Sequence, residues 1–488
     1  MSSLGSVVPQ ARAILAIRGG SLATTAASLP IHGSEHEVVD VQALGFSISP
    51  RAQAVICMAI AMALHYTGYS FARPSTVALF TSAKTGYAKS PAAFPLAMAF
   101  ISPVSLGLLM MYGRALHRFG PNGALSLTTL LCSGVLSGSA FLILSLQNSA
   151  ATLFSVPLVK LICGPLFVFR ESYVQMLTSQ YWSFMSSVLT PAQSATWFAP
   201  ISGLTSIASA LAGMNVSRLV RRVGLPGALI TTSFMMLLSL LPVRTAYSIA
   251  DKNGFNPSKE KKSIGKETES KGMIAKAASL FAREPTLGAL FLEIICAQGL
   301  ATVLSVCFVT KLSAAIPDDS LRAGWMGKFF AWTNVCSMTI QFGVLPHLMK
   351  VIEPRSLWRA LPIVMVVLSS FQALQKVPSL YLVSGSLLAM KALEYSARRL
   401  LDEMVFVPLD FESRFLGKEV IGVFGYRFGK STMSLFLSGL TATFGNMGLQ
   451  QLSMLTSGTA LLWFTMAWRL SKLVPTKAQA EALYQARK

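Results

Sequence analysis

The sequence predicts an all-α membrane protein with twelve transmembrane helices in two six-helix halves. Three observations carry this prediction: twelve apolar runs, one charged segment that divides them six and six, and a composition that is 53% hydrophobic and only 12% charged. A spanning helix needs about 20 apolar residues, whereas soluble domains carry about 25% charged residues. Soluble enzymes and nucleic-acid-binding proteins are therefore excluded. The net charge of +21 instead indicates cytosol-facing loops and anionic lipid headgroups.

Six predicted spans form the first half, residues 51–250. The fourth run is longer than one crossing, so it tilts or extends beyond the bilayer. The runs are Ala52–Phe71, Ala92–Gly113, Gly123–Leu146, Val156–Ser187, Trp197–Val216 and Leu225–Val243. Ahead of them, residues 1–50 form a tail that is basic, Ser-rich and free of acids before Glu35. Two interpretations of this tail stay open, an organelle targeting segment and a disordered tail.

A charged linker, residues 251–284, leads to the second half, residues 285–474. The linker carries seven lysines and Arg283, and a basic tail, residues 475–488, follows the last span. The runs of this half are Leu287–Val309, Trp325–His347, Trp358–Leu374, Leu380–Met390 continuing past Lys391, Val420–Phe444 and Leu452–Leu470.

The distribution of Lys and Arg predicts the orientation of the chain. Basic residues are more numerous in the loops that share a side with the linker and both chain ends, for example at Arg114, Arg118, Lys350 and Arg355. Because cytosolic loops are enriched in Lys and Arg, the linker and both ends are predicted to face the cytosol or its organellar equivalent.

Charged residues recur at similar positions in the two halves. Glu171 and Glu403 lie at nearly the same distance from the first span of their half, and Arg73 and Lys311 form a second such pair. A parallel repeat of this kind is typical of carriers in which two bundles rock about a central site. We therefore expect these charges to face a central cavity, with chance agreement as the alternative.

Charged residues inside the apolar runs are the candidates for a binding site. A charge at the bilayer centre costs about 2.5–3.5 kcal/mol, so it needs a partner, water or a substrate. Glu171 follows Arg170 and shares a helix face with Gln175, four residues on. It can therefore contribute to a substrate site, or form only a local ion pair with Arg170 at the membrane interface.

The densest charged stretch in the apolar part of the chain begins at Lys391. Lys391, Glu394 and Arg398 are spaced by three and four residues, which places them on one helix face. If the tenth helix continues, this face lines a polar cavity. If the helix ends near Leu393, the same face is solvated.

Two further cations lie in the eleventh run. Lys430 and Arg427 suit an anionic ligand, because phosphate is bound by Lys and by bidentate Arg. The tripeptide that contains Lys430, Gly-Lys-Ser, is not a P-loop, because Phe424 occupies the position of the first glycine and no strand precedes it.

Cysteine and histidine give no sign of covalent chemistry. The six cysteines lie inside apolar runs without CxxC spacing, and the five histidines are scattered. The sequence therefore indicates no catalytic residue, no metal site and no cofactor, and a multi-pass membrane enzyme is disfavoured.

Short motifs in the last quarter of the chain resemble those of a known family. The matching residues are Lys391, Tyr395-Ser396, Glu403-Met404, Pro408-Leu409, Gly417-Lys418 and Gly429-Lys430-Ser431. Here the chain is similar to the ATP/ADP translocases of plastids and intracellular bacteria. The turn Gly113–Gly120 also resembles the loop after the second span in the major facilitator superfamily.

The resemblance implies a fold of the major facilitator type and a carrier that exchanges ATP for ADP by alternating access. It implies a nucleotide and the lipid bilayer as partners, no nucleic acid, and a monomeric multi-pass protein of an organellar membrane such as the plastid envelope. The expected substrate-binding residues are Arg73, Glu171, Lys391, Glu403, Lys418, Arg427 and Lys430.

The chain also departs from the family pattern in its cations. The family shows Arg-Asp-Thr-Lys in its first span, whereas here Pro74, Ser75 and Thr76 follow Arg73. Ala97 stands where the family has a lysine in its second span. Two alternatives therefore stay open: a carrier of the same fold for another small organic anion or metabolite, and a carrier-derived membrane protein that transports nothing.

Overall fold

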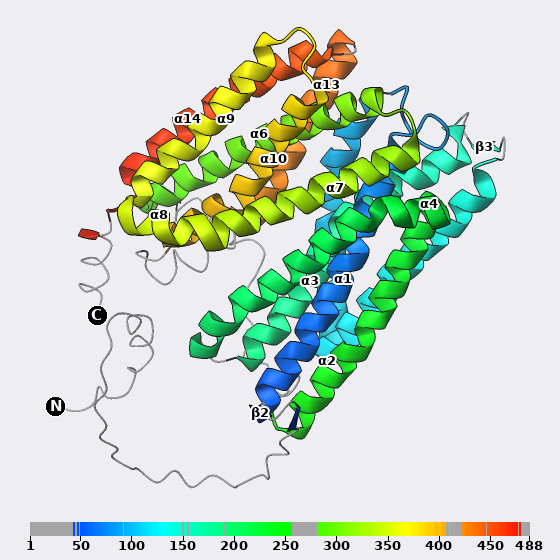
Figure 1. Cartoon of the computed structure of the whole chain (residues 1–488), viewed down its shortest axis with the longest axis vertical. Coiled ribbons are helices and arrows are strands. Elements are labelled where there is room, and N and C mark those ends of the chain that lie inside the picture. Colours follow the sequence, from blue (N-terminus) through cyan, green and yellow to red (C-terminus); the bar gives the residue numbers. More distant parts are fainter. Residues whose placement is uncertain are drawn as a thin grey trace.

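The computed structural model consists almost entirely of helices, arranged in two bundles (Figure 1). The residues that the structure describes are 42–43, 46–47, 49–255, 281–406, 409 and 421–479, apart from short gaps at 91, 149–150, 154–155, 190, 446 and 477. Two short antiparallel hairpins accompany the helices, β1 (Gln42–Ala43) with β2 (Phe46–Ser47) and β3 (Thr152–Leu153) with β4 (Val156–Pro157).

The first bundle contains four continuous helical stretches. They are α1 (Pro50–Phe80), α2 (Ala93–Leu146), α3 (Leu158–Val188) and α4 (Pro191–Lys252). α2 and α4 each turn back at a glycine in the left-handed region, Gly120 with φ 69° and Gly224 with φ 72°. Glycine adopts this conformation without steric penalty. α2 and α4 are therefore each a pair of helices, and each pair covers two of the predicted spans.

The second bundle is interrupted by π-helical segments. Its elements are α6 (Pro285–Ala315), α7 (Asp319–Met338), η2 (Thr339–Val344), α8 (Leu345–Val351), α9 (Pro354–Leu374), α10 (Leu380–Leu393), η3 (Glu394–Arg398), α11 (Arg399–Phe406), η4 (Ile421–Phe428), α13 (Gly429–Phe444) and α14 (Leu449–Leu473). The helix that begins at Leu380 does not end near Leu393 but continues through η3 to Phe406. Isolated π-helical turns within α-helices are frequently found at functional sites.

Length and apolar character allow a membrane crossing for five of the helices in the described part of the chain. These are Pro50–Phe80, Ala93–Leu146, Pro200–Lys252, Pro285–Ala315 and Pro354–Leu374. Large apolar side chains such as Phe141, Phe234 and Leu241 are about 60% exposed on the outside of the bundles. The predicted all-helical membrane class is therefore confirmed at the level of helices and their apolar character.

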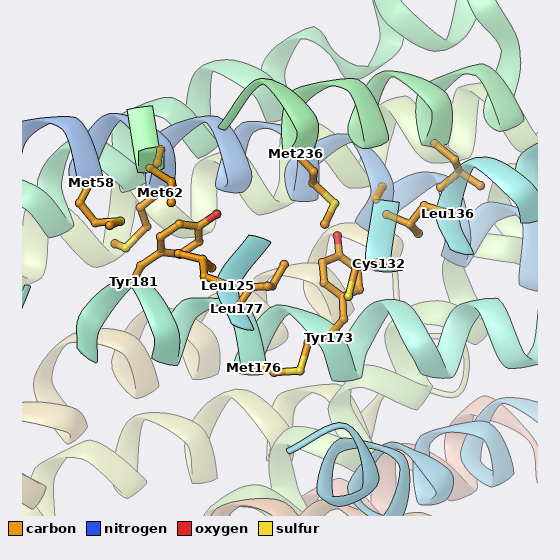
Figure 2. Close-up of a cluster of buried hydrophobic side chains, with 14 of the residues drawn as sticks. Met58, Met62, Leu125, Cys132, Leu136, Tyr173, Met176, Leu177, Tyr181 and Met236 are labelled. Atoms are coloured by element: carbon orange, nitrogen blue, oxygen red, sulfur yellow. The ribbon is translucent and has the colours of Figure 1, made fainter. Parts of the chain in front are cut away.

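Sulfur-containing and aromatic side chains fill much of the first bundle's core. Met58 and Met62 of α1 face Tyr181 of α3, and Met236 of α4 reaches toward Tyr173 (Figure 2). Methionine is flexible and fills irregular gaps between helices. His65 is fully buried among Tyr66, Tyr173 and Tyr181, with ring centroids 5.7–5.9 Å away. It is a packing residue of this core.

Among the described residues, the buried apolar cluster that contains residues of both bundles lies at one end. One cluster of buried residues lies within the first bundle apart from Ala323, and another lies within the second. A third contains residues of both bundles, among them Phe80 and Phe167 with Leu304, Met326 and Phe329. The shared cluster lies where α1 ends and α7 begins.

Close backbone contacts hold this end together. A Cβ atom on Gly213 of α4 would lie 2.7 Å from the carbonyl oxygen of Gly327 in α7, and the reverse distance is 2.6 Å. Arg322 of α7 donates a hydrogen bond of 3.2 Å to the carbonyl oxygen of Ala78 in α1. At the opposite end, where α1 and α6 begin and α4 and α14 end, the bundles diverge (Figure 1).

Candidate functional site

Four of the predicted site residues meet at the interface between the bundles. Arg73 of α1 and Glu171 of α3 come from the first bundle, and Lys391 of α10 and Lys430 of α13 come from the second. Glu171 interacts electrostatically with Arg73 and with Lys430. Lys391 interacts with Arg73 across the same interface. We call these residues, with Arg170 and Glu394, the central cluster.

Glu171 is held in place by its sequence neighbour. Arg170 is fully buried and forms an ion pair with Glu171, while its Nε donates a hydrogen bond of 2.7 Å to Thr76 Oγ1 on α1. Thr76 therefore anchors Arg170 from a neighbouring helix. The sequence left two possibilities open for Glu171: a local ion pair with Arg170 or a place in a central site. In the structure Glu171 forms the ion pair and also lies at the interface between the bundles.

Arg73 is positioned by aromatic rings. Its guanidinium lies 3.6 Å from the centroid of the Phe330 ring on α7, in the opposite bundle. It also interacts with Tyr69 of α1 and Tyr395 of η3. A cation stacked on a ring keeps its N–H donors available at its edge, which suits an anionic ligand.

Lys391 is paired with an acid one helical turn further on. Its Nζ lies 2.7 Å from Glu394 Oε2, and Gln298 of α6 donates a hydrogen bond of 2.8 Å to Glu394 Oε1. All three side chains are buried. Glu394 and Gln298 therefore join the candidate site, and neither was among the site residues predicted from the sequence. The three-residue spacing of Lys391 and Glu394 was the sequence signal that could have identified Glu394. Gln298 is neutral and gave no such signal.

Lys430 is electrostatically coupled to acids of both bundles. It interacts electrostatically with Glu171 of the first bundle and Glu394 of the second. Gly429 allows this position, because a Cβ there would lie 3.3 Å from Gln298 Cβ and so α13 approaches α6 closely. Lys430 is only half-buried, so a bound anion can reach it.

Arg398 does not share the site with Lys391 and Glu394, which corrects the prediction of one charged face. It is buried inside the second bundle, with Nε and Nη2 at 3.0 and 2.7 Å from the two carboxylate oxygens of Glu293 on α6. Trp463 of α14 donates a hydrogen bond of 2.5 Å to the same carboxylate, and Asp402 lies 4.0 Å from Arg398 Nη1. The π-helical turn η3 lies between Lys391 and Arg398 and alters the helical spacing.

The remaining predicted site residues lie outside what the structure describes. Lys418 lies outside the described residues, and so do the side chains of Glu403 and Arg427. Within the described part of the chain, no group of three or more His, Cys, Asp or Glu side chains could hold a metal ion. The six cysteines are free.

The charges of the central cluster do not cancel. Its members are four cations, Arg73, Arg170, Lys391 and Lys430, and two acids, Glu171 and Glu394, so its formal charge is +2. An excess of positive charge at the interface of two bundles is suited to an anionic ligand.

Comparisons with known proteins agree with this chemistry. Residues 380–474 match a family model described as TLC ATP/ADP transporter. ADP,ATP carrier protein 1 of Chlamydia trachomatis serovar D is 26% identical over 247 residues, and that of Chlamydia pneumoniae is 27% identical over 246 residues. The aligned stretch is 46% of this chain and 46–47% of those relatives, so the chain spans about half of their length.

Solved structures give the fold over most of the chain. A mutant of the nucleoside transporter NupG matches with a TM-score of 0.60 and 11% identity, covering 86% of this chain and 100% of that one. The xylose transporter XylE from E. coli matches with a TM-score of 0.55 and 14% identity, covering 88% and 99%. The chain therefore shares the fold of these two transporters over most of its length, and the match over residues 380–474 confirms the resemblance to the ATP/ADP translocase family.

Proposed function

We propose that this protein is a twelve-span carrier that exchanges ATP and ADP, or closely related nucleotides, by alternating access. The central cluster is the observation that carries the proposal. It brings Arg73, Lys391 and Lys430 together from both bundles at their interface, with a formal charge of +2. Similarity to ADP,ATP carrier proteins supports a nucleotide as the anion.

The acids of the cluster provide a physical reason for exchange. In the empty carrier, Glu171 and Glu394 neutralise part of the positive charge but leave an excess. A buried net charge is costly, so the empty carrier changes conformation slowly. A bound phosphate group offsets the excess and competes with both carboxylates for the lysines. The loaded carrier therefore moves more readily, and net transport requires a counter-substrate.

The arrangement of the bundles supports alternating access. The bundles pack together where α7 meets α1 and α4 and diverge at the other end (Figure 1). Carriers with two repeated halves move by rocking these halves about a central site. We assign the diverging end to the cytosolic side, because α1, α6 and the ends of α4 and α14 adjoin the basic tails and linker.

The domain limits and the membrane are part of the same proposal. Residues 51–250 and 285–474 form the two bundles, with 251–284 as a cytosolic linker, and the carrier acts as a monomer. The basic, Ser-rich residues 1–50 favour an organellar membrane. Fusing residues 1–50 to a fluorescent protein tests this, and a diffuse cytosolic signal would contradict it.

Exchange in proteoliposomes tests the function. Vesicles preloaded with unlabelled ADP should take up labelled ATP with saturation, and Lys430→Ala should abolish uptake because it removes the cation coupled to Glu171 and Glu394. Lys472→Ala is the matched control, since Lys472 is exposed at the end of α14. Equal uptake by the Lys430→Ala and Lys472→Ala variants would exclude the assigned site.

A smaller organic anion is the second candidate substrate. It is favoured because Arg170 and Lys391 are already paired with Glu171 and Glu394, which leaves less positive charge than a triphosphate carries negative. Competition of labelled nucleotide uptake by small phosphorylated and carboxylated anions separates the candidates. Absence of any flux in correctly inserted protein would instead indicate a carrier-derived protein that transports nothing.

A further inference from the structure

We infer that the exposed face of α4 ahead of Gly224 binds an anionic phospholipid, with its acyl chains along apolar side chains and its phosphate at three arginines. We call Arg218, Arg221 and Arg222 the arginine cluster. The ligand is a lipid of the surrounding bilayer, so the inference goes beyond the proposed function and does not depend on which solute the central cluster binds.

The apolar side chains of this face form one stripe along the helix. They are 42–59% exposed, and they are Leu204, Ile207, Leu211 and Met214. Spacings of three and four residues place them on one side of a helix. Val216 and Val220 lie on the other side and are buried in the bundle. The stripe therefore faces the bilayer and not the central cluster.

The arginine cluster continues the same stripe. Arg218 lies four residues after Met214, Arg221 and Arg222 follow one turn later, and all three are exposed. With a rise of about 1.5 Å per residue, the apolar part from Leu204 to Met214 is about 15 Å long. This length is half of a hydrocarbon core of about 30 Å. When the apolar part spans one leaflet, the arginines therefore lie at the depth of the headgroups.

The guanidinium groups retain donors for a phosphate. Arg218 Nη1 donates a hydrogen bond of 3.2 Å to Asn215 Oδ1, and Arg221 Nε donates one of 3.3 Å to the Ser217 carbonyl oxygen. These bonds hold two side chains along the helix, and each uses one donor of its guanidinium. Among the described residues, no carboxylate forms an ion pair with any of the three arginines. A lipid phosphate can supply this anion, since Arg binds phosphate in a bidentate manner.

Acids on the neighbouring helix are already engaged. α7 lies against this part of α4, because a Cβ on Gly324 would lie 3.0 Å from Ser217 Cβ. At the start of α7, Asp319 forms an ion pair with Arg322. Asp318 accepts a hydrogen bond of 2.7 Å from a backbone N–H in the first turn of α7. The charge of the arginine cluster is therefore left for a ligand from outside the chain.

The arginine cluster lies on the side of the membrane where basic residues are less common. It is at the end where the bundles are in contact, away from the starts of α1 and α6, and the proposed function assigns that end to the non-cytosolic side. Lys and Arg are enriched in cytosolic loops, so the insertion of the chain does not explain three arginines within five residues here. Attraction of an anionic lipid does explain them.

Quenching by brominated lipid tests the site. A bimane fluorophore is attached to Met214→Cys, in a protein without the native cysteines, and the protein is placed in phosphatidylcholine nanodiscs. Part of the lipid is then replaced by phosphatidylglycerol or by phosphatidylcholine, each with the same brominated acyl chains. The same fluorophore on Phe371→Cys, at an exposed position three residues before the end of α9, reports on a lipid-facing helix outside the proposed site.

Brominated phosphatidylglycerol should quench the label on Met214→Cys at a lower lipid fraction than brominated phosphatidylcholine does, and the label on Phe371→Cys should show no such difference. Arg218→Gln with Arg222→Gln should raise the phosphatidylglycerol fraction for half-maximal quenching by about thirtyfold, as expected for the loss of two cations at a charged lipid. Arg218→Lys with Arg222→Lys keeps both charges and should lose less.

The matched control removes two other exposed cations at the same end of the molecule. Lys84→Gln with Lys89→Gln alters the loop between α1 and α2 and should leave the preference for phosphatidylglycerol unchanged. Equal quenching by both lipids on Met214→Cys, the same preference on Phe371→Cys, or an unchanged preference after Arg218→Gln with Arg222→Gln would overturn the inference. Relief of the quenching by soluble glycerol 3-phosphate would also overturn it, because the cluster would then bind a free phosphate ester.

The readout also separates the lipid site from the proposed function, because quenching requires no transport. A protein that prefers phosphatidylglycerol at this face but exchanges no nucleotide would keep the lipid site and lose the proposed function. Nucleotide exchange without any lipid preference at this face would remove the lipid site and leave the exchanger.

Discussion

Lys430 of the second bundle interacts with Glu171 of the first across the interface that a carrier must open and close. Glu171 is also ion-paired with buried Arg170 in its own bundle. An anion that binds Lys430 would therefore weaken the link between the bundles.

Glu171→Gln should separate binding from transport. The change leaves a hydrogen-bonding side chain beside Arg170 but raises the charge of the central cluster from +2 to +3. Anions should bind more tightly and leave more slowly, so KM and the maximal exchange rate should both fall by about tenfold, which corresponds to about 1.4 kcal/mol. Initial rates over a range of ADP concentrations measure both, and Glu171→Asp, which keeps the charge, is the control.

Lys391 and Glu394 should behave as a coupled pair in stability. They lie 2.7 Å apart and are both buried, so removing either partner leaves an uncompensated charge, which costs about 3–5 kcal/mol. Lys391→Met with Glu394→Gln removes both charges and should be more stable than either single variant. Melting temperatures of the four proteins in detergent form the cycle, and additive losses would mean that the pair is not coupled.

The double variant gives a second readout. It should fold but bind ADP and pyrophosphate more weakly by a similar factor, because Lys391 belongs to the phosphate end of the site. Unchanged affinity for both would assign the Lys391–Glu394 pair to folding alone.

The buried network around Arg398 should matter for stability and not for substrate choice. Arg398 makes two hydrogen bonds to Glu293, and Trp463 makes a third to the same acid. Trp463→Phe removes one donor to a buried carboxylate and should lower stability by about 1–3 kcal/mol. The ratio of AMP to ribose 5-phosphate affinity should stay at its wild-type value. A changed ratio would show that the network also shapes the site.

The apolar runs predicted the helices well because burial in lipid requires long uninterrupted apolar helices. The reversals at Gly120 and Gly224 link consecutive predicted spans through a single left-handed glycine each, where the sequence suggested a longer loop. Charge inside apolar runs predicted Glu171, Lys391 and Lys430 as site candidates, since such a charge needs a partner, water or a ligand. Arg73 was predicted from the repeat and from the family resemblance.

Other parts of the site carried no such signal. Thr76, Gln298 and Phe330 hold the charged residues through neutral contacts, which composition does not mark. Arg398 was assigned to the wrong face because ordinary helical spacing was assumed across η3, where a π-helical turn intervenes. The pairing of Arg398 with Glu293 depends on residues 105 positions apart, which only the folded chain brings together.

Gly327→Val should shift the carrier away from the conformation described here. A Cβ at this position would lie 2.6 Å from both the Gly213 carbonyl oxygen and Val216 Cβ, so the bundles cannot stay in contact at the closed end. We expect slower exchange and greater access from that end. Labelling of Ser102→Cys, in a background without the native cysteines, by an impermeant thiol reagent added on that side measures the access. Ser102 is buried against Ser431 of the other bundle, with 2.6 Å between the hydroxyl oxygens.

A glycine without close neighbours provides the comparison for this prediction. A Cβ on Gly385 of α10 would meet nothing within 4 Å, so Gly385→Val tests the effect of a branched residue in a helix of the same bundle without a clash. It should leave both labelling and exchange near wild type. If Gly327→Val also left labelling unchanged while the protein remained folded, the contact between α4 and α7 would not control access. Rocking of the two bundles about the central cluster would then need another closure point, and the shared apolar packing around Phe80 and Phe329 would be the next place to test.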